Sequence, residues 1–205
     1  MLRDDLFLLA HDDDGRLIVS EPMIGAGLAG AMLVDLLLGG QVAVVDGRLD
    51  VVDPTQTGDP EADATVGAIA ANTDPTGPRA WVSWISDGIY ERTGTALAAA
   101  GVVVRTTVRR LGLLPVLRYQ PANSDDLVRL RARLRFGVHS AEPPDPQTAA
   151  LAGLVAALRL HQSLLLSMPP EQLLAELDLL AGGNSTTVRQ VIRAVDGVIT
   201  AAAYR

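Results

Sequence analysis

The chain has 205 residues, no cysteine and a formal net charge of −7. A chain of this length can bury a core without a disulfide or metal staple, and the lack of cysteine excludes disulfides, thiolate metal sites and a cysteine nucleophile. The start, Met1–Asp5, lacks the basic stretch of a signal peptide, and the longest apolar stretch, Met23–Leu38, is shorter than a bilayer span and contains Asp35. We therefore expect a soluble, cytoplasmic protein.

The charge is divided unequally along the chain. Residues 1–100 hold 5 arginines and 16 acidic residues, whereas residues 101–205 hold 12 arginines and 8 acidic residues. Within 102–138, 8 arginines accompany only Asp125 and Asp126. Such asymmetry indicates either an anionic partner for one face or pairing between the two halves, and the sequence leaves both interpretations open.

Hydrophobic periodicity, capping residues and turn signals predict a mainly α fold. The predicted helices cover residues 2–10, 27–38, 61–71, 79–86, 90–100, 124–136, 147–166, 171–180 and 187–204. Residues 16–19 are expected to form a short strand. Two β-hairpins are predicted, 42–45 with 49–52 around Asp46-Gly47, and 102–110 with 115–119 around a tip at 111–114. We expect a single domain, 1–205, built as a helical bundle with one hairpin protruding.

Residues 25–30 match the G-x-G-x-x-G pattern of dinucleotide-binding proteins, and Asp46 follows at about the distance of the acid that binds the ribose. In those proteins a parallel strand runs directly into the glycines, whose backbone approaches a pyrophosphate. Here Pro22 interrupts the preceding segment, and Asp46-Gly47 turns the next strand back where a crossover helix is required. We favour close packing of a central helix, and a dinucleotide-binding oxidoreductase is the third hypothesis for function.

The remaining polar residues form no catalytic or metal-binding pattern. His11, His139 and His161 stand far apart, without H-E-x-x-H spacing. The run Asp12–Gly15 lacks the distal glutamate of a calcium loop, and no G-x-S-x-G elbow is present. We therefore expect a protein that is not an enzyme and holds no cofactor or metal.

The predicted helix that starts at Ser124 concentrates arginines on a regular pattern. Its apolar positions follow helical spacing and form the core face: Leu127, Leu130, Leu134 and Val138. Arg129 and Arg133 are one turn apart on the opposite face, where we expect them to be exposed and within reach of one anion. Arg131 and Arg135 pair in the same way and flank the apolar face.

The second hairpin has a leucine-rich tip bordered by arginine. Arg109 and Arg110 lead into Leu111, Leu113 and Leu114, which we expect to be exposed in the monomer. Such a tip suits shallow membrane insertion, because arginine meets phosphates while leucine enters the acyl boundary, and it suits contact with another subunit equally well. The helix–helix–hairpin order also imitates a winged helix, but the second helix carries only Arg92, so we expect no nucleic-acid binding.

Several segments resemble a bacterial member of the Golgi phosphoprotein 3 family. They are Asp4-Asp5-Leu6-Phe7-Leu8-Leu9, the turn Asp14-Gly15-Arg16-Leu17, the helix from Gly27 to Val42, the segment Leu97–Val103 and the arginine-rich helix. The resemblance implies a helical bundle with a protruding hairpin, no catalysis, and recognition of phosphatidylinositol 4-phosphate on a membrane. It also implies homo-oligomerisation through the hairpin and membrane-protein clients.

The resemblance places a headgroup pocket on the arginine-rich helix. Arg129 falls on a family arginine and Arg133 on a basic position, with Arg131 beside them. A family tryptophan position falls near Ser20 and a family arginine position on Ala29, so both of those side chains are absent. We therefore expect a non-enzymatic protein on the cytoplasmic face of a membrane that binds anionic phospholipid headgroups, phosphatidylinositol 4-phosphate by resemblance. The alternative is a protein-binding scaffold that acts through the 102–119 hairpin without lipid.

Overall fold

The computed structural model of the chain describes residues 1–71, 77–110, 114–140, 142–164 and 168–203. These residues form nine α-helices, one short 3₁₀ helix and two antiparallel hairpins, which confirms the predicted mainly α fold. In chain order the elements are α1 (Leu2–Leu9), α2 (Glu21–Leu38), β1 (Val42–Val45), β2 (Arg48–Val51), α3 (Pro60–Ala71), α4 (Pro78–Ile85), α5 (Ile89–Ala99), β3 (Val103–Arg110), β4 (Leu114–Pro121), α6 (Ser124–His139), α7 (Pro146–Ala157), η1 (Leu160–Leu164), α8 (Pro170–Gly182) and α9 (Thr186–Ala203).

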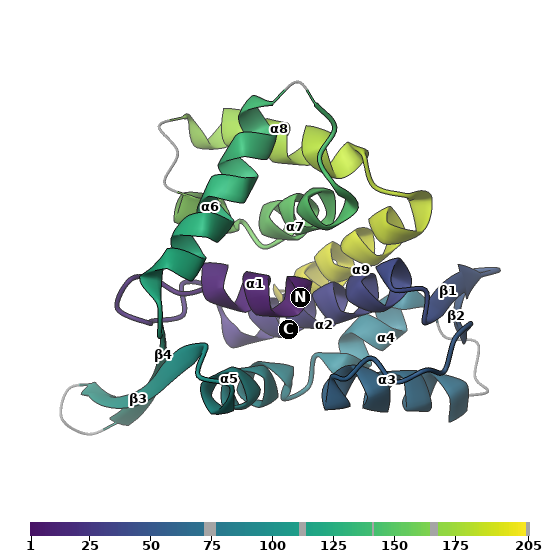
Figure 1. Ribbon diagram of the computed structural model, residues 1–205, viewed down its shortest axis with the longest axis horizontal. Helices are drawn as coiled ribbons and strands as arrows, with labels where there is room; N and C mark the ends of the chain where they lie inside the picture. The colour runs from purple at the N-terminus through teal and green to yellow at the C-terminus, as the bar shows by residue number, and fades with distance from the viewer. Residues whose placement is uncertain (72–76, 111–113, 141, 165–167, 204–205) are drawn as a thin grey trace.

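Helix α2 lies at the centre of the bundle. Helices α1, α4, α5, α7 and α9 all pack against it (Figure 1). Among the described residues α2 is the one helix whose length and composition would allow it to cross a membrane, and most of it is buried inside the protein. An apolar helix enclosed by others on all sides is the expected arrangement for a core helix.

The glycines of α2 permit this close packing. A Cβ atom added to Gly25 would lie 2.9 Å from the carbonyl oxygen of Ser86, at the end of α4. One added to Gly27 would lie 2.6 Å from a methyl group of Leu158, and one added to Gly30 would collide with Val195 of α9. Small residues are therefore required where α2 meets its neighbours.

Two predictions at the start of α2 are wrong. The helix begins at Glu21, six residues earlier than expected, because Ser20 is extended and Pro22 occupies the first turn, where its missing N–H has no helical partner to lose. The strand expected at 16–19 does not form. Only Leu17 pairs there, with His11 in an isolated bridge, and the rest of the segment is an irregular turn.

The predicted helix 147–166 is also wrong, because it is broken. Helix α7 ends at Ala157, Arg159 adopts a left-handed conformation with φ of 56°, and η1 continues in a new direction. The break lets Leu158, Leu160 and Leu164 all enter the core while Arg159 stays exposed. Tertiary packing here overrides a local helical preference, with no glycine or proline to mark the position.

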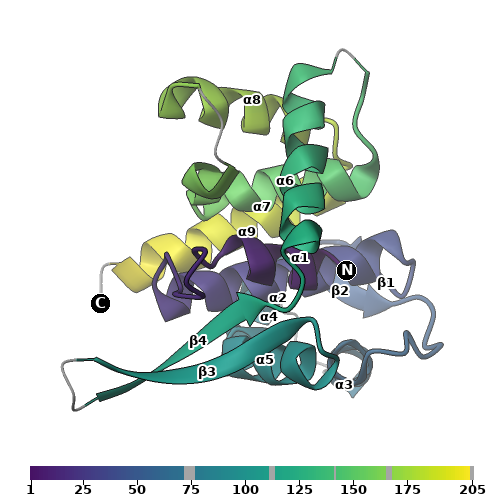
Figure 2. The ribbon, with the colours of Figure 1, turned by 60° about the vertical axis from the view of Figure 1, so that its left-hand side comes forward.

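Both predicted hairpins are confirmed. Asp46 and Gly47 have positive φ angles of 50° and 79°, as expected for a two-residue turn of type I′. In the second hairpin, β3 pairs with β4 from Val103–Pro121 at the base to Arg110–Leu114 near the tip. Its base is anchored by buried Val103 and Tyr119, and the rest projects away from the body (Figure 2).

An aromatic cluster joins the hairpin base to the bundle. The ring of Tyr119 lies edge-on to Phe7 of α1 at 5.2 Å and to Tyr90 of α5 at 5.8 Å, measured between ring centroids. His11 is buried in the same cluster, where its Nδ1 lies 2.7 Å from the Phe7 carbonyl oxygen and its Nε2 lies 3.0 Å from the Tyr90 hydroxyl. Because Tyr119 lies near the end of β4, this cluster also sets the position from which the chain enters α6.

Candidate functional site

Helix α6 carries the arginines that the sequence singled out. The helix starts at Ser124, as predicted, and Asn123 caps it by accepting a hydrogen bond from the Asp125 amide at 3.0 Å. Its leucines are buried as predicted and face α1, α7, α8 and η1: Leu127, Leu130 and Leu134. The opposite face of α6 is open to solvent (Figures 1 and 2).

Arg129 and Arg133 line the same cavity, of about 350 Å³, between α6, the start of α1 and the end of α5. Arg129 is 70% exposed and its Nη2 lies 2.6 Å from Asp126 Oδ1. Arg133 is 37% exposed and its Nη2 lies 2.8 Å from Asp5 Oδ2. The two guanidinium groups are thus brought to one place, as the helical spacing predicted.

Arg131 does not join them. It is only 14% exposed, lies on the other edge of α6, and its Nη2 is 3.6 Å from Asp13 Oδ1 in the turn before α2. The ion pairs of Arg131 and Arg133 join the acidic first half of the chain to the basic second half, so pairing between the halves accounts for part of the charge asymmetry. Sequence spacing carries no signal for such distant pairs.

Carboxylates share the cavity with the two arginines. Asp4, Asp5 and Asp126 line it, and burial raises the pKa of Asp4 in spite of the neighbouring Arg3. The recorded ion pairs occupy one nitrogen of each guanidinium. Arg133 Nε is buried and finds no acceptor within the described part of the chain. An anion at this cavity would meet the guanidinium nitrogens that the ion pairs leave unused, in competition with Asp5 and Asp126.

The remaining family pocket positions lie elsewhere. Ser20 is exposed and precedes α2, whereas Ala29 is fully buried within α2. No guanidinium reaches the cavity from position 29. Of the family pocket positions considered, those on α6 are the ones that line this cavity.

The hairpin tip cannot be compared with its prediction. Leu111 and Leu113 lie outside the described residues, as do the side chains of Arg109, Arg110 and Leu114. Nearer the base, three valines are exposed on one face of the hairpin: Val104, Val108 and Val116. The sequence analysis overlooked these valines, although the alternation along β3 signals them.

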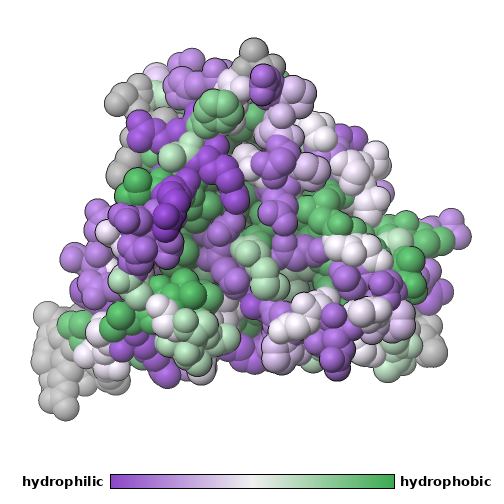
Figure 3. All heavy atoms as spheres, viewed as in Figure 1, coloured by the Kyte–Doolittle hydropathy of each residue, from purple (hydrophilic) through white to green (hydrophobic). Residues whose placement is uncertain are grey.

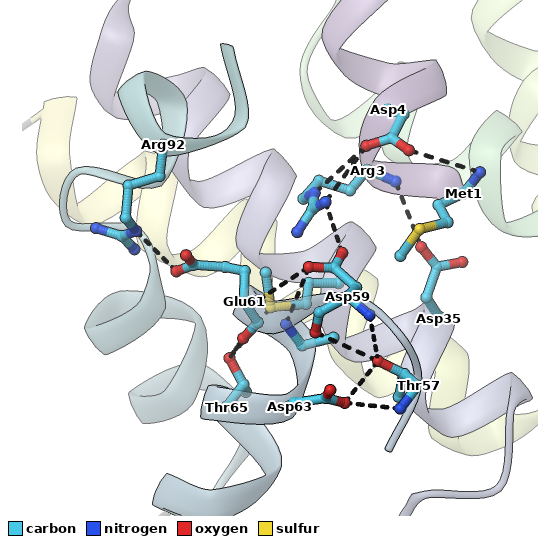
Figure 4. Close-up of polar contacts among 12 residues, drawn as sticks. Met1, Arg3, Asp4, Asp35, Thr57, Asp59, Glu61, Asp63, Thr65 and Arg92 are labelled. Atoms are coloured by element: carbon cyan, nitrogen blue, oxygen red, sulfur yellow. Dashed lines mark hydrogen bonds and ion pairs between the residues drawn. The ribbon is translucent and has the colours of Figure 1, made fainter. Parts of the chain in front are cut away.

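A second polar cluster holds its charges in ion pairs and joins elements of the fold (Figure 4). Arg3 is buried, its Nη2 lies 2.6 Å from Asp59 Oδ2, and its Nε lies 3.5 Å from Asp4 Oδ1. Asp35 accepts hydrogen bonds from the amides of Leu2 and Arg3. These contacts join α1 to α2 and to the segment before α3. The charges of the cluster pair with one another.

The G-x-G-x-x-G residues lie inside α2, beginning at its fifth position, and no strand leads into them. Their backbone amides belong to the helix interior, where they cannot cradle a phosphate. A cavity of about 880 Å³ lies between the start of α2, α4 and the end of α9. It contains Glu21, Asp87 and Arg79 with mainly small side chains, and residues 25–30 are not among those that line it.

A family of known proteins matches nearly the whole chain. Residues 2–195 match the family described as Golgi phosphoprotein 3 (GPP34). No curated protein matches the chain. The matched segment runs from the first residue of α1 into the last helix, α9. The chain belongs to the Golgi phosphoprotein 3 family.

Proposed function

We propose that this protein is a non-enzymatic peripheral membrane protein that binds anionic phospholipid headgroups through the arginines of α6, on the cytoplasmic face of a membrane. The observation that carries the proposal is the shared cavity of Arg129 and Arg133, each of which uses one guanidinium nitrogen in an ion pair. Guanidinium groups bind phosphate oxygens in pairs of parallel hydrogen bonds. A phosphate at this cavity would accept hydrogen bonds from guanidinium nitrogens that are not used in these ion pairs.

Family membership supports the same function. By resemblance to the family, phosphatidylinositol 4-phosphate is the first headgroup to test. Because Ser20 and Ala29 stand where the family pocket has a tryptophan and an arginine, the proposal covers the wider class of anionic headgroups. Asp5 and Asp126 oppose the bound anion, so we expect modest affinity that falls with rising salt.

The test is flotation with vesicles of phosphatidylcholine alone, or with added phosphatidylserine or phosphatidylinositol 4-phosphate. The parent should float with anionic vesicles only. An exposed arginine near an anionic surface contributes on the order of 1 kcal/mol, so Arg129→Ala with Arg133→Ala should weaken binding about thirtyfold. Thermal stability should change little, because the Arg129–Asp126 pair is exposed and the Arg133–Asp5 pair is only partly buried.

The matched control changes two exposed arginines on α4 and α9, Arg79→Ala with Arg193→Ala. It removes the same charge and should float with anionic vesicles nearly as well as the parent. A parent that floats with no vesicle would exclude lipid binding. If both double variants lose vesicle binding equally, the loss is due to the change in net charge and not to a site on α6.

A second candidate function is a protein-binding scaffold that acts through the β3–β4 hairpin without lipid. The exposed valines of that hairpin, Val104, Val108 and Val116, favour it. Exposed apolar side chains on a projecting element commonly mark a contact with another protein. This function predicts association in solution and no affinity for vesicles.

A further inference from the structure

The outer face of α6 carries an apolar stripe, which we define as Val128, Ala132 and Phe136. All three are exposed, Val128 to 59% and Phe136 to 71%. They are spaced four residues apart, so they fall within an arc of roughly 80° on the helix. That arc is opposite Leu127, Leu130 and Leu134, which face the core. A surface helix ordinarily has polar residues at these positions.

Two arginines border the stripe on each side. Arg129 and Arg133 follow one edge, and Arg131 and Arg135 follow the other. In Figure 3 the most hydrophilic side chains on the visible face lie over α6, with hydrophobic side chains among them. Asp125, in the first turn, is the acidic residue on this outer face, and His139 lies at its other end.

No described element covers this face. The elements that pack on α6 are α1, α7, α8, η1 and β4, and they lie on the side of the buried leucines. The stripe follows the helix for most of its 16 residues. An exposed apolar surface with a charged border is typical of a contact site rather than of a solvated surface.

We propose that α6 lies flat on an anionic bilayer, with Phe136, Val128 and Ala132 entering the boundary between headgroups and acyl chains and with Arg129, Arg133 and Arg135 binding lipid phosphates, while Arg131 stays paired with Asp13. A helix with an apolar centre and arginine edges has the composition of an interfacial membrane helix. A nucleic acid would meet the arginines but not the apolar stripe, and a purely electrostatic lipid site would not need it. This inference rests on the proposed function and adds an orientation and an apolar contribution to it.

The first experiment changes the stripe and leaves the arginines in place. In Val128→Ser with Phe136→Ser, the two side chains point to solvent, so the fold and thermal stability should be retained. Vesicle binding should fall about tenfold or more, because the apolar part of the contact is lost. At about 0.5 M NaCl the parent should keep part of its binding, since apolar insertion is not screened, whereas the variant should keep none.

A matched control removes equally exposed apolar side chains elsewhere. Val52 is 64% exposed after β2 and Leu179 is 72% exposed on α8. Val52→Ser with Leu179→Ser should bind vesicles as the parent does. If both double variants lose binding equally, the effect is one of general surface hydrophobicity and the inference fails.

The lack of cysteine permits a direct measurement of insertion. Ala132→Cys can be labelled at one site with an environment-sensitive fluorophore, and Ala99→Cys, exposed on α5, provides the control. The label at 132 should shift to the blue and become accessible to lipid-borne quenchers on anionic vesicles, while the label at 99 should not. A label at 132 that stays in water while the protein floats would overturn the inference.

The proposed function and this inference fail in distinguishable ways. A short-chain, water-soluble phosphoinositide below its micellar concentration should bind the stripe variant and the parent alike. A stripe variant that floats like the parent would remove the inference and leave headgroup binding intact. A stripe variant that floats normally but loses self-association would assign the stripe to a protein contact. If the parent protein floats with no vesicle, both the proposed function and this inference are wrong.

Discussion

At the scale of single residues, Asp126 competes with any anion for Arg129. The carboxylate lies 2.6 Å from Arg129 Nη2, and the side chains of Arg129 and Asp126 are 70% and 44% exposed. We expect Asp126→Asn to tighten binding to anionic vesicles about fivefold, because one repelled charge near an anionic surface is worth about 1 kcal/mol. Vesicle titration would measure the change. Asp178→Asn, exposed on α8, should have little effect, and weaker binding by Asp126→Asn would contradict a headgroup site at Arg129.

His11 is a second residue with a measurable consequence. A backbone carbonyl can only accept, so Nδ1–H donates to the Phe7 carbonyl oxygen and Nε2 accepts from the Tyr90 hydroxyl, which requires a neutral ring. Burial lowers the pKa of His11 below its ordinary value of 6.5. As the pH falls through 6.5, the imidazole of His11 becomes protonated in the unfolded chain but stays neutral in the folded chain.

The free energy of unfolding should therefore decrease on acidification below about pH 6.5, at up to about 1.4 kcal/mol per pH unit from this one group. His11→Gln should be less stable at neutral pH but should show a shallower decrease. Urea unfolding of both proteins at a series of pH values provides the test. Parallel curves for parent and variant would show that His11 does not cause the slope.

At the scale of elements, local signals predicted most of the fold. Asp46-Gly47 specified the first hairpin. Gly101, with φ of 72°, follows α5 and ends it where expected. At the start of α9, the Ser185 hydroxyl accepts a hydrogen bond from the Val188 amide. The break at Arg159 was missed, because its cause is the burial of leucines on both sides of it. A sequence pattern cannot report which neighbour a leucine will meet.

The candidate site was predicted in part. Helical spacing placed Arg129 and Arg133 together, but the pairing of Arg133 with Asp5 joins residues 128 positions apart. The exposure of Val128 and Phe136 could not be predicted from the sequence either, because apolar residues next to a leucine-rich face are normally expected to be buried. Both properties depend on how α6 is rotated against α1 and α7.

The projecting hairpin gives a prediction for one element. Deleting Arg109–Pro115 should leave the fold and its thermal stability nearly unchanged, because the buried base residues Val103 and Tyr119 remain. Self-association or vesicle binding should weaken if the tip makes the contact. Sedimentation velocity and flotation would measure the two effects. A deletion that unfolds the protein, seen by circular dichroism, would show that the tip is part of the core.

At the scale of the whole molecule, stability depends on how closely helices approach α2. Gly25→Ala should destabilise the fold by about 2 kcal/mol, because the new methyl group meets the backbone carbonyl of Ser86, which cannot rotate away. Gly67→Ala is the matched control, since it lies in a helix with nothing within 4 Å of the added methyl group. That change should stabilise by about 0.5–1 kcal/mol. Urea unfolding of both variants would show whether close approach is the cause.

The enclosure of α2 by later segments has a consequence for synthesis. A ribosome completes α2 long before it completes α7 and α9, the helices that cover its Gly27 and Gly30 positions. During that interval the growing chain carries an uncovered apolar helix long enough to be taken for a membrane segment. The nascent protein should therefore need a chaperone until translation ends, and chains truncated before α9 should aggregate or be degraded.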